Sequence, residues 1–539
     1  MADPHTPEIP PIAARRSFWR TNGWRNGFQL WAVTHLAPMW TLLRWLPGVR
    51  SATNRLLINR LIYKMRTRPH LLSTKSPYTS WESLTDRTYS ARHLPPDLQL
   101  QHRLQPEASV AELFRRKEPR VSAKSTLLFS HFAQWFVDGF LRTDPNDVTR
   151  NTSTHDIDLS QLYGQTEDVT DLLRTHCCGR LKSQQLDGGE FPAYYFGRDG
   201  RVKPEFEGLP LSSPDGDRKA VGLNPTGAPG QNLFALGIPR GNIHYGFVML
   251  STLFLREHNR LAGLISAEHP DWDDERIFQT ARNTLIVILL KIAIEDYIDH
   301  ITPFHFKLFV EPGIGVREKW YRQNWMSIEF DLLYRWHPLV PTELVVGGER
   351  RATDGVLWQT DVVPRVGLAA LFDEASRQPS TEIGLRNTAE FLLDTEERTI
   401  AIGRTAALAG FNDYRRACGY PRLRSFSDFS ADPDVASALA ARYRSVDDVE
   451  LYVGLFAEDV RPNSALPTVM GTMVAVDAFS QALTNPLLAK SAFNASTFSR
   501  AGLRAIKRTS RLQDLVDRNT PGEATKPLVT FTRTDSTAT

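Results

Sequence analysis

The segment LLYRWHPLVP, residues 332–341, places a phenol and an imidazole where they can act together. Tyr334 and His337 are three residues apart, and residues at positions i and i+3 of a helix lie side by side. Pro338 biases His337 away from helical geometry, so we expect a helix to end here. A histidine held at a helix end can ligate a metal ion, and a phenol beside it can be a redox partner of that metal. Because short motifs also occur by chance, an ordinary pair of core residues is the alternative.

Long apolar stretches predict that helices carry this segment and pack around it. Residues 125–144, 241–270 and 276–301 each read as one helix. The centre of the third, LIVILLKIAI, is apolar on nearly all sides, which is typical of a helix buried within a protein. Lys291 and the short length of this centre argue against a membrane span. Strand patterns are sparse, so we expect a mainly α-helical body.

The N-terminal part has a composition of its own. Residues 1–18 are Pro-rich and predicted to be disordered. Between positions 9 and 81 there is no Asp or Glu, whereas twelve Lys or Arg occur, and five of the twelve tryptophans fall in 19–45. Short helices rich in Trp and Leu with flanking arginines suit a membrane interface. Residues 19–72 are therefore predicted to bind a membrane surface; the alternative is a basic arm that packs on the body or binds a partner.

Bulk properties narrow the setting. The chain has 539 residues and is 41% hydrophobic, which is ample for a large core. Length suggests three or four domains, with one large helical domain as the alternative. A net charge of +3 gives no indication of a nucleic-acid partner. The three cysteines, Cys177, Cys178 and Cys418, form no evenly spaced disulfide framework, and no secretory signal opens the chain. We therefore expect a cytoplasmic location.

Three longer segments carry a family resemblance. They are LFLREHNRLAGLISAEHPDWDDERIFQTAR, KIAIEDYIDHITPFHFKLF and EFDLLYRWHPLVP. The first is similar to the long central helix of the haem peroxidase–cyclooxygenase superfamily, and the other two are similar to segments of prostaglandin synthases. The resemblance runs through residues 24–500 in the expected order and is greatest to bacterial fatty-acid dioxygenases of this superfamily. It implies a mainly α-helical, animal-type haem peroxidase/cyclooxygenase fold. One large helical domain (73–510) would surround a b-type haem, with an N-terminal membrane-binding arm and a C-terminal tail (511–539).

The resemblance also implies roles for the opening pair. His337 would be the proximal ligand of the haem iron, as His is in other peroxidases. Tyr334 would form a tyrosyl radical when the haem has reacted with a peroxide, and that radical would take a hydrogen atom from a lipid. Tyr297, in EDYIDH, matches a tyrosine that hydrogen-bonds the radical tyrosine. Trp336 matches a residue of the substrate channel, with a plain core role as the open alternative.

The distal side departs from the family pattern. The family places a glutamine and then, four residues later, a histidine on one helix face; Gln134 matches the first, but Asp138 stands at the second. A distal base accepts the proton of a hydroperoxide and returns it to the leaving oxygen. A carboxylate with its usual pKa near 3.9 is a weaker base at neutral pH, so we expect poor peroxidase turnover. His131, on the same face, is a candidate substitute or an ordinary core histidine.

Other implied sites match less closely. Phe304 replaces the tyrosine at the mouth of the prostaglandin synthase channel. Arg66 is a candidate anchor for a fatty-acid carboxylate, with Arg68 as its rival, because the arginine fork donates two parallel hydrogen bonds. A solvated basic arm is the alternative for both. The acylatable serine of the family falls at either Ala478 or Ser480, and neither is assigned.

A calcium loop is the last implied feature. THDIDLSQLYG resembles the Thr-x-x-x-Asp-x-Ser loop of related peroxidases and α-dioxygenases. Thr154, Asp158 and Ser160 would supply the oxygen ligands that calcium prefers. The partner aspartate of the family is Gly139 here, so an ordinary Asx or Ser/Thr turn is the alternative.

Together these residues predict a haem-dependent dioxygenase on one membrane leaflet that adds O2 to an unsaturated fatty acid and releases a hydroperoxide. Weak peroxidase activity is compatible with this activity, since a regenerated tyrosyl radical supports many turnovers. One alternative is a haem peroxidase that oxidises small donors. Another is a non-catalytic haem- or lipid-binding protein. A homodimer is expected only by analogy with prostaglandin synthases.

Overall fold

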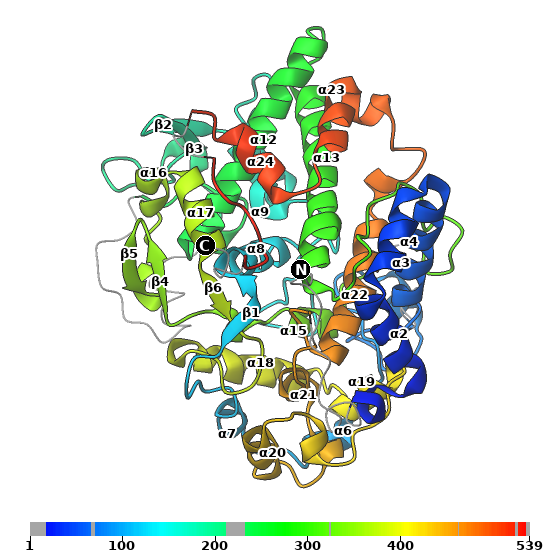
Figure 1. The fold of residues 1–539 in the computed structure, drawn as a ribbon. Helices are drawn as coiled ribbons and strands as arrows, with labels where there is room; N and C mark the ends of the chain where they lie inside the picture. Colours follow the sequence, from blue (N-terminus) through cyan, green and yellow to red (C-terminus); the bar gives the residue numbers. More distant parts are fainter. Residues whose placement is uncertain are drawn as a thin grey trace.

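The computed structural model is mainly helical, as predicted (Figure 1). The residues that it describes are 18–65, 71–211, 232–322, 325–461, 463–522 and 526–534. Within that part the strands form three antiparallel pairs. They are β1 (Val121–Thr126) with β6 (Pro379–Thr381), β2 (Ser183–Leu186) with β3 (Gly189–Pro192), and β4 (Glu343–Val346) with β5 (Glu349–Ala352).

Two long helices form the centre of the domain. They are α12 (Tyr245–Glu268) and α13 (Asp274–Ile292), which pack along each other and appear in green in Figure 1. The predicted helix 276–301 continues beyond α13 through a π-helical turn, η3 (Ala293–Tyr297), and ends in α14 (Ile298–Ile301). Such wide turns are rare and often occur at functional sites. Here the wide turn contains Tyr297.

The predicted helix 125–144 is shorter in the structure. Residues 121–126 form β1, helix α8 covers Leu127–Val137, and Asp138 caps its C-terminus. The chain then turns, with the Phe140 amide donating to the Val137 carbonyl. The helix starts later than predicted because the serines and threonine before Leu127 have low helix propensity. It ends earlier than predicted because Gly139 is unfavourable within a helix.

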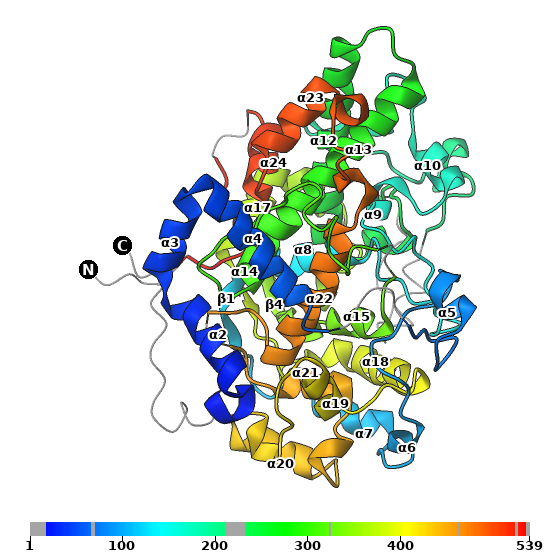
Figure 2. The same cartoon turned by 90° about the vertical axis from the view of Figure 1, so that its right-hand side faces the viewer.

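The N-terminal arm is helical over its described part. It contains α2 (Trp24–His35), α3 (Ala37–Trp45) and α4 (Pro47–Ile62), drawn in blue along one flank in Figures 1 and 2. Helix α4 packs on α22 (Thr468–Leu483). Its side chains reach the body, since Asn54 donates to the Phe309 carbonyl at 2.9 Å. The predicted disordered segment 1–18 lies outside the described residues except for its last residue.

Residues 511–539, set apart as a tail in the sequence, include ordered structure. They contain α24 (Leu512–Asn519), which packs on α12. Further on, Phe531 is buried, and its ring lies 5.9 Å from that of Tyr297. The described part of this segment therefore belongs to the core of the domain.

One helix among the described residues is long and apolar enough to cross a membrane by composition. It runs from Asp274 to Ile301, and 78% of its most apolar window is buried inside the protein. The core helix of a soluble protein passes the same test. Its burial agrees with the interior position predicted from the sequence.

Candidate active site

One cavity of about 460 Å³ brings the predicted site residues together. Its size lies within the usual range of cofactor and ligand pockets. Several parts of the chain line it, among them α8, the segment that leads into α12, and residues 331–341. The predicted residues that line it are His337, Tyr334, Trp336, Gln134, Asp138 and His131.

The proximal wall is a short, tightly turned segment. Helix α15 (Ile328–Leu333) ends before Tyr334, and a 3-10 turn, η4 (His337–Leu339), follows. Tyr334 and His337 therefore do not share one helix, so the predicted i, i+3 arrangement is wrong in this detail. Pro338 and the non-helical backbone of Trp336 (φ −86°, ψ 49°) separate the two. Both side chains nevertheless line the same cavity.

His337 lies beside a buried carboxylate. Its Nδ1 lies 3.2 Å from Oε2 of Glu396, whose side chain is fully buried. The carboxylate can only accept a hydrogen bond, so Nδ1 is the nitrogen that would carry the proton. The lone pair of Nε2, on the other edge of the ring, is then left for a ligand in the cavity. This is the form of histidine that binds a metal.

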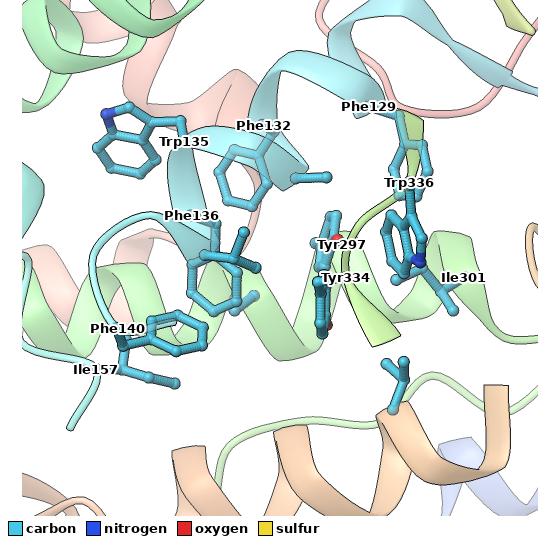
Figure 3. Packing of buried hydrophobic residues seen from close by; sticks show 14 of the residues in the cluster. Phe129, Phe132, Trp135, Phe136, Phe140, Ile157, Tyr297, Ile301, Tyr334 and Trp336 are labelled. Atoms are coloured by element: carbon cyan, nitrogen blue, oxygen red, sulfur yellow. The ribbon is translucent and has the colours of Figure 1, made fainter. Parts of the chain in front are cut away.

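Tyr334 and Tyr297 lie against each other in an apolar aromatic cluster, which Figure 3 shows from close by. The Tyr334 ring stacks on that of Trp336 at 4.6 Å, and the Tyr297 ring stacks on that of Phe129 at 5.3 Å. Neither tyrosine hydroxyl has the geometry of a hydrogen bond to any described residue. Burial raises the pKa of both phenols, and the nearby Tyr334 raises the pKa of Tyr297 further. Both groups therefore stay neutral and keep their O–H bonds.

The distal wall holds Asp138 between opposing influences. Desolvation raises the pKa of its carboxyl above the usual value, while the charges of Arg240 and Arg142 lower it and only partly offset that effect. We expected Asp138 to keep an ordinary pKa, but its surroundings raise the pKa instead. A higher pKa makes the carboxylate a better base near neutral pH.

Gln134 is fixed by a histidine that the sequence did not reveal. His244 caps the N-terminus of α12, and its Nδ1 accepts from the Phe247 amide at 3.2 Å. Its Nε2 must then carry the proton, and it donates to Oε1 of Gln134 at 3.0 Å. Burial, and to a lesser extent Arg240, lowers the pKa of His244 to about 4, so the ring is neutral. The carboxamide NH2 of Gln134 is thereby turned away from His244.

His131 is not placed as a free base. Its Nε2 lies 3.0 Å from the Tyr245 hydroxyl, and its ring stacks on His244 at 5.3 Å. Burial lowers the pKa of His131, and the neighbouring His244 lowers it further. It lines the cavity as a neutral residue bonded to Tyr245.

Three site residues were missed in the sequence: Arg240, His244 and Glu396. Arg240 lies in a short 3-10 helix, η2 (Pro239–Asn242), which no sequence pattern indicated. His244 stands directly before an apolar run, which is a cap position. Glu396 falls on the apolar face of α18 (Leu393–Thr405), and a charged residue on such a face could have been noticed.

The other predicted residues that the structure describes do not line this cavity. Phe304 is half-buried in the irregular segment after α14. Arg66 and Arg68 lie outside the described residues. A separate, narrow space of about 10 Å³ lies beside Phe330. Mainly apolar side chains line it, including that of Ala478. The Ser480 hydroxyl instead bonds the Val476 carbonyl of its own helix.

The predicted calcium residues come together but bond one another. The Thr154 hydroxyl donates to Asp158 at 2.7 Å, and the Ser160 amide donates to the same carboxylate at 2.9 Å. Arg87 donates to the Thr154 carbonyl at 2.6 Å, which brings a positive charge to the loop. These bonds agree with the turn alternative, and calcium stays a prediction.

Comparisons with known proteins define the class. The sequence profile of the family described as animal haem peroxidase matches residues 98–352 and 370–530. Prostaglandin G/H synthase 2 of Equus caballus is 30% identical over 511 residues, which cover 91% of this chain and 80% of that protein.

Two solved structures share the fold. One is the fatty acid alpha-dioxygenase of Arabidopsis thaliana, with a TM-score of 0.69, 16% identity, and coverage of 93% of this chain and 90% of that chain. The other is peroxidase A from Dictyostelium discoideum, with a TM-score of 0.65, 19% identity, and coverage of 87% and 96%. The chain belongs to the animal haem peroxidase family and is an oxidoreductase. The resemblance and the fold class read from the sequence are confirmed.

Haem is implied by this family, and the residues of the cavity fit it. His337 offers a nitrogen lone pair to a cavity whose proximal wall also contains the apolar side chains of Leu339, Val340 and Leu344. Apolar walls suit the faces of a flat macrocycle, and a neutral imidazole suits its iron. His337 would hold the iron, and Gln134 and Asp138 line the same cavity.

Proposed function

We propose that this protein is a haem-dependent dioxygenase that converts an unsaturated fatty acid to a lipid hydroperoxide through a radical on Tyr334. The observation that carries the proposal is the position of Tyr334: a neutral, buried phenol in the wall of the cavity, beside Tyr297 and three residues before His337. Relatives named for prostaglandin synthesis and for fatty acid dioxygenation support the same substrate class.

The chain's residues then divide the work. A haem held by His337 supplies the one-electron oxidation that leaves Tyr334 as a radical. The phenoxyl oxygen takes a hydrogen atom from an activated C–H bond of the lipid, and O2 adds to the carbon radical. The resulting peroxyl radical takes the hydrogen atom back from Tyr334. The sum is RH + O2 → ROOH, and Tyr334 is again a radical.

The surroundings of Tyr334 suit this chemistry. Phe330, whose ring lies 5.3 Å from that of Tyr334, also lines the narrow space of about 10 Å³ beside it. That space is at most large enough for one water molecule, so an acyl chain needs these side chains to move. An apolar site without water also protects carbon and tyrosyl radicals from side reactions.

Replacing one oxygen atom tests the proposal. Tyr334→Phe should retain haem and abolish oxygen uptake with oleate, linoleate or arachidonate, because only the hydrogen-atom carrier is removed. Tyr163→Phe is the matched control, since Tyr163 is equally buried but bonds His258 outside the cavity. Full oxygen uptake by Tyr334→Phe would show the radical mechanism to be wrong.

The same proposal places the N-terminal arm on one membrane leaflet, as a monotopic attachment on the cytoplasmic side. Exposed apolar side chains support this: Trp24 is 77%, Leu42 63% and Trp45 79% exposed. Trp24→Ser with Trp45→Ser should reduce co-sedimentation with anionic vesicles. Trp81→Ser, at an exposed tryptophan outside the arm, is the control. Equal binding by all three proteins would exclude the arm as the attachment site.

Peroxidase activity is a second candidate, favoured by the raised pKa of Asp138 and by Arg240 and Arg142 near it. Guaiacol oxidation with hydrogen peroxide measures it. Strong turnover without lipid-dependent oxygen uptake would make peroxidation the main activity.

A further inference from the structure

The carboxyl group of Glu396 occupies an unusual environment. Its side chain is fully buried on α18, on the face that also contains Leu393 and Ile400. An ionised carboxylate that leaves water without partners is strongly destabilising. The groups around Glu396 must therefore compensate for its burial.

Hydroxyl groups satisfy part of this requirement. Thr388 Oγ1 donates to Oε1 of Glu396 at 2.7 Å, and the Tyr452 hydroxyl donates to Oε2 at 2.6 Å. The nearest arginine, Arg335, donates to Asp331 at 2.7 Å instead. Among the described residues the one basic group within ion-pair distance of Glu396 is His337, with 3.2 Å between its Nδ1 and Oε2.

His337 Nδ1 and Glu396 Oε2 are close to each other, but the contact does not have the geometry of a hydrogen bond. Hydrogen bonds at such sites are often poorly aligned until the ligand is bound. A metal-ligating histidine commonly donates its second N–H to a carboxylate, which fixes the ring and raises its basicity as a ligand.

We propose that Glu396 is the positioning residue of the proximal histidine: it accepts the Nδ1 proton of His337, directs Nε2 into the cavity and makes the imidazole a stronger electron donor to iron. This inference rests on the haem ligation assigned to His337 in the proposed function. Stronger donation stabilises ferric over ferrous iron, because the more highly charged ion gains more from it.

The isosteric variant Glu396→Gln tests this role. It keeps the shape and a hydrogen-bond acceptor but removes the negative charge. Glu329→Gln is the matched control, because Glu329 is also fully buried and bonds the Tyr414 hydroxyl outside the cavity. Both variants lose one buried carboxylate, so a purely structural effect should be similar in the two.

Two spectroscopic readouts on the haem-loaded protein separate the possibilities. Glu396→Gln should favour ferrous iron by about tenfold, a rise of about 59 mV in the one-electron midpoint potential. It should also lower the iron–histidine stretching frequency of the ferrous form in resonance Raman spectra. Glu329→Gln should leave both unchanged. Wild-type values of both quantities in Glu396→Gln would overturn the proposal.

Two further measurements keep the test decisive. If Glu396→Gln does not fold, the iron–histidine frequency of the ferrous wild type can be compared with that of free imidazole–haem. A higher frequency supports the proposal, and an equal one rejects it. Neither readout needs a fatty acid, so failure of dioxygenase activity would leave the outcome for Glu396 intact. Retention of normal haem spectra in His337→Ala would reject both proposals.

Discussion

The two faces of the cavity are built in different ways. The proximal face comes from one short segment, in which Tyr334, Trp336 and His337 follow one another, with Glu396 behind them. The distal face is assembled from α8 and from the loop before α12, which supplies Arg240 and His244. The residue that would bind the iron therefore lies in a short local segment. The groups that would bind and protonate a peroxide come together only through tertiary packing.

The largest difference between the faces should appear in haem affinity. His337→Ala removes the one imidazole that presents a lone pair to the cavity from the proximal wall, and we expect haem binding to weaken by about 100-fold or more. Gln134→Ala, on the distal face, should change it only slightly, because Gln134 supplies no ligand to the iron. Titration of each protein with haem, followed at the Soret band, measures this. Equal losses in the two variants would mean that the faces are not distinct in this way.

The second prediction concerns the base on the distal face. Asp138→His should raise guaiacol turnover by less than the ~100-fold that a positioned general base contributes in full, because the wild-type carboxylate already serves as a weaker base. Asp138→Asn should reduce turnover below the wild-type level, because an amide cannot accept the proton.

The pH profile gives an independent check on Asp138. Its base form is the ionised one, so wild-type peroxidase activity should fall as the pH decreases through the raised pKa of this carboxyl. The decline should therefore begin at a higher pH than for an ordinary aspartate. A profile that is the same in Asp138→Asn would exclude Asp138 as the base.

The contrast between the faces also explains what the sequence could predict. LLYRWHPLVP contains both the proposed proximal ligand and the proposed radical tyrosine within ten residues, so a short motif was sufficient to suggest them. Even there the bend at Trp336 was not foreseen, because it depends on how α15 ends against the body. The helices 241–270 and 276–301 were predictable from their long apolar patterns.

The distal and supporting groups were harder to predict because they act only after folding. Asp138 was identified, but its pKa depends on the burial of the site and on Arg240, which is 102 residues away in the chain. His244 lay inside the predicted helix 241–270, and Glu396 stands among other charged residues in TEERTI. Their roles follow from contacts between segments that no local pattern links.

A smaller effect is expected when the hydrogen bond from His244 to Gln134 is removed. His244→Phe removes the N–H that donates to Gln134 Oε1 and frees the carboxamide to rotate. A neutral hydrogen bond is worth about 1 kcal/mol, so azide binding to the haem-loaded protein should weaken by about fivefold. His258→Phe, at a buried histidine outside the cavity that also has a pKa of about 4, is the control. Unchanged azide affinity in His244→Phe would mean that Gln134 does not need this support.

The smallest predicted effect concerns the shared oxygen of Glu396. The Tyr452 hydroxyl and His337 Nδ1 both face Oε2, so they compete for its lone pairs. Tyr452→Phe removes one competitor, and Glu396 should then accept more strongly from His337. The midpoint potential should move down, opposite to Glu396→Gln and by less than its shift, because the charge of the carboxylate is kept. Tyr443→Phe removes a similar bond, from a buried tyrosine to Glu450 at 2.9 Å, and should leave the potential unchanged. A rise in Tyr452→Phe would instead mean that Tyr452 holds Glu396 in place for His337, so that the proximal face depends on tertiary contacts as much as the distal face does.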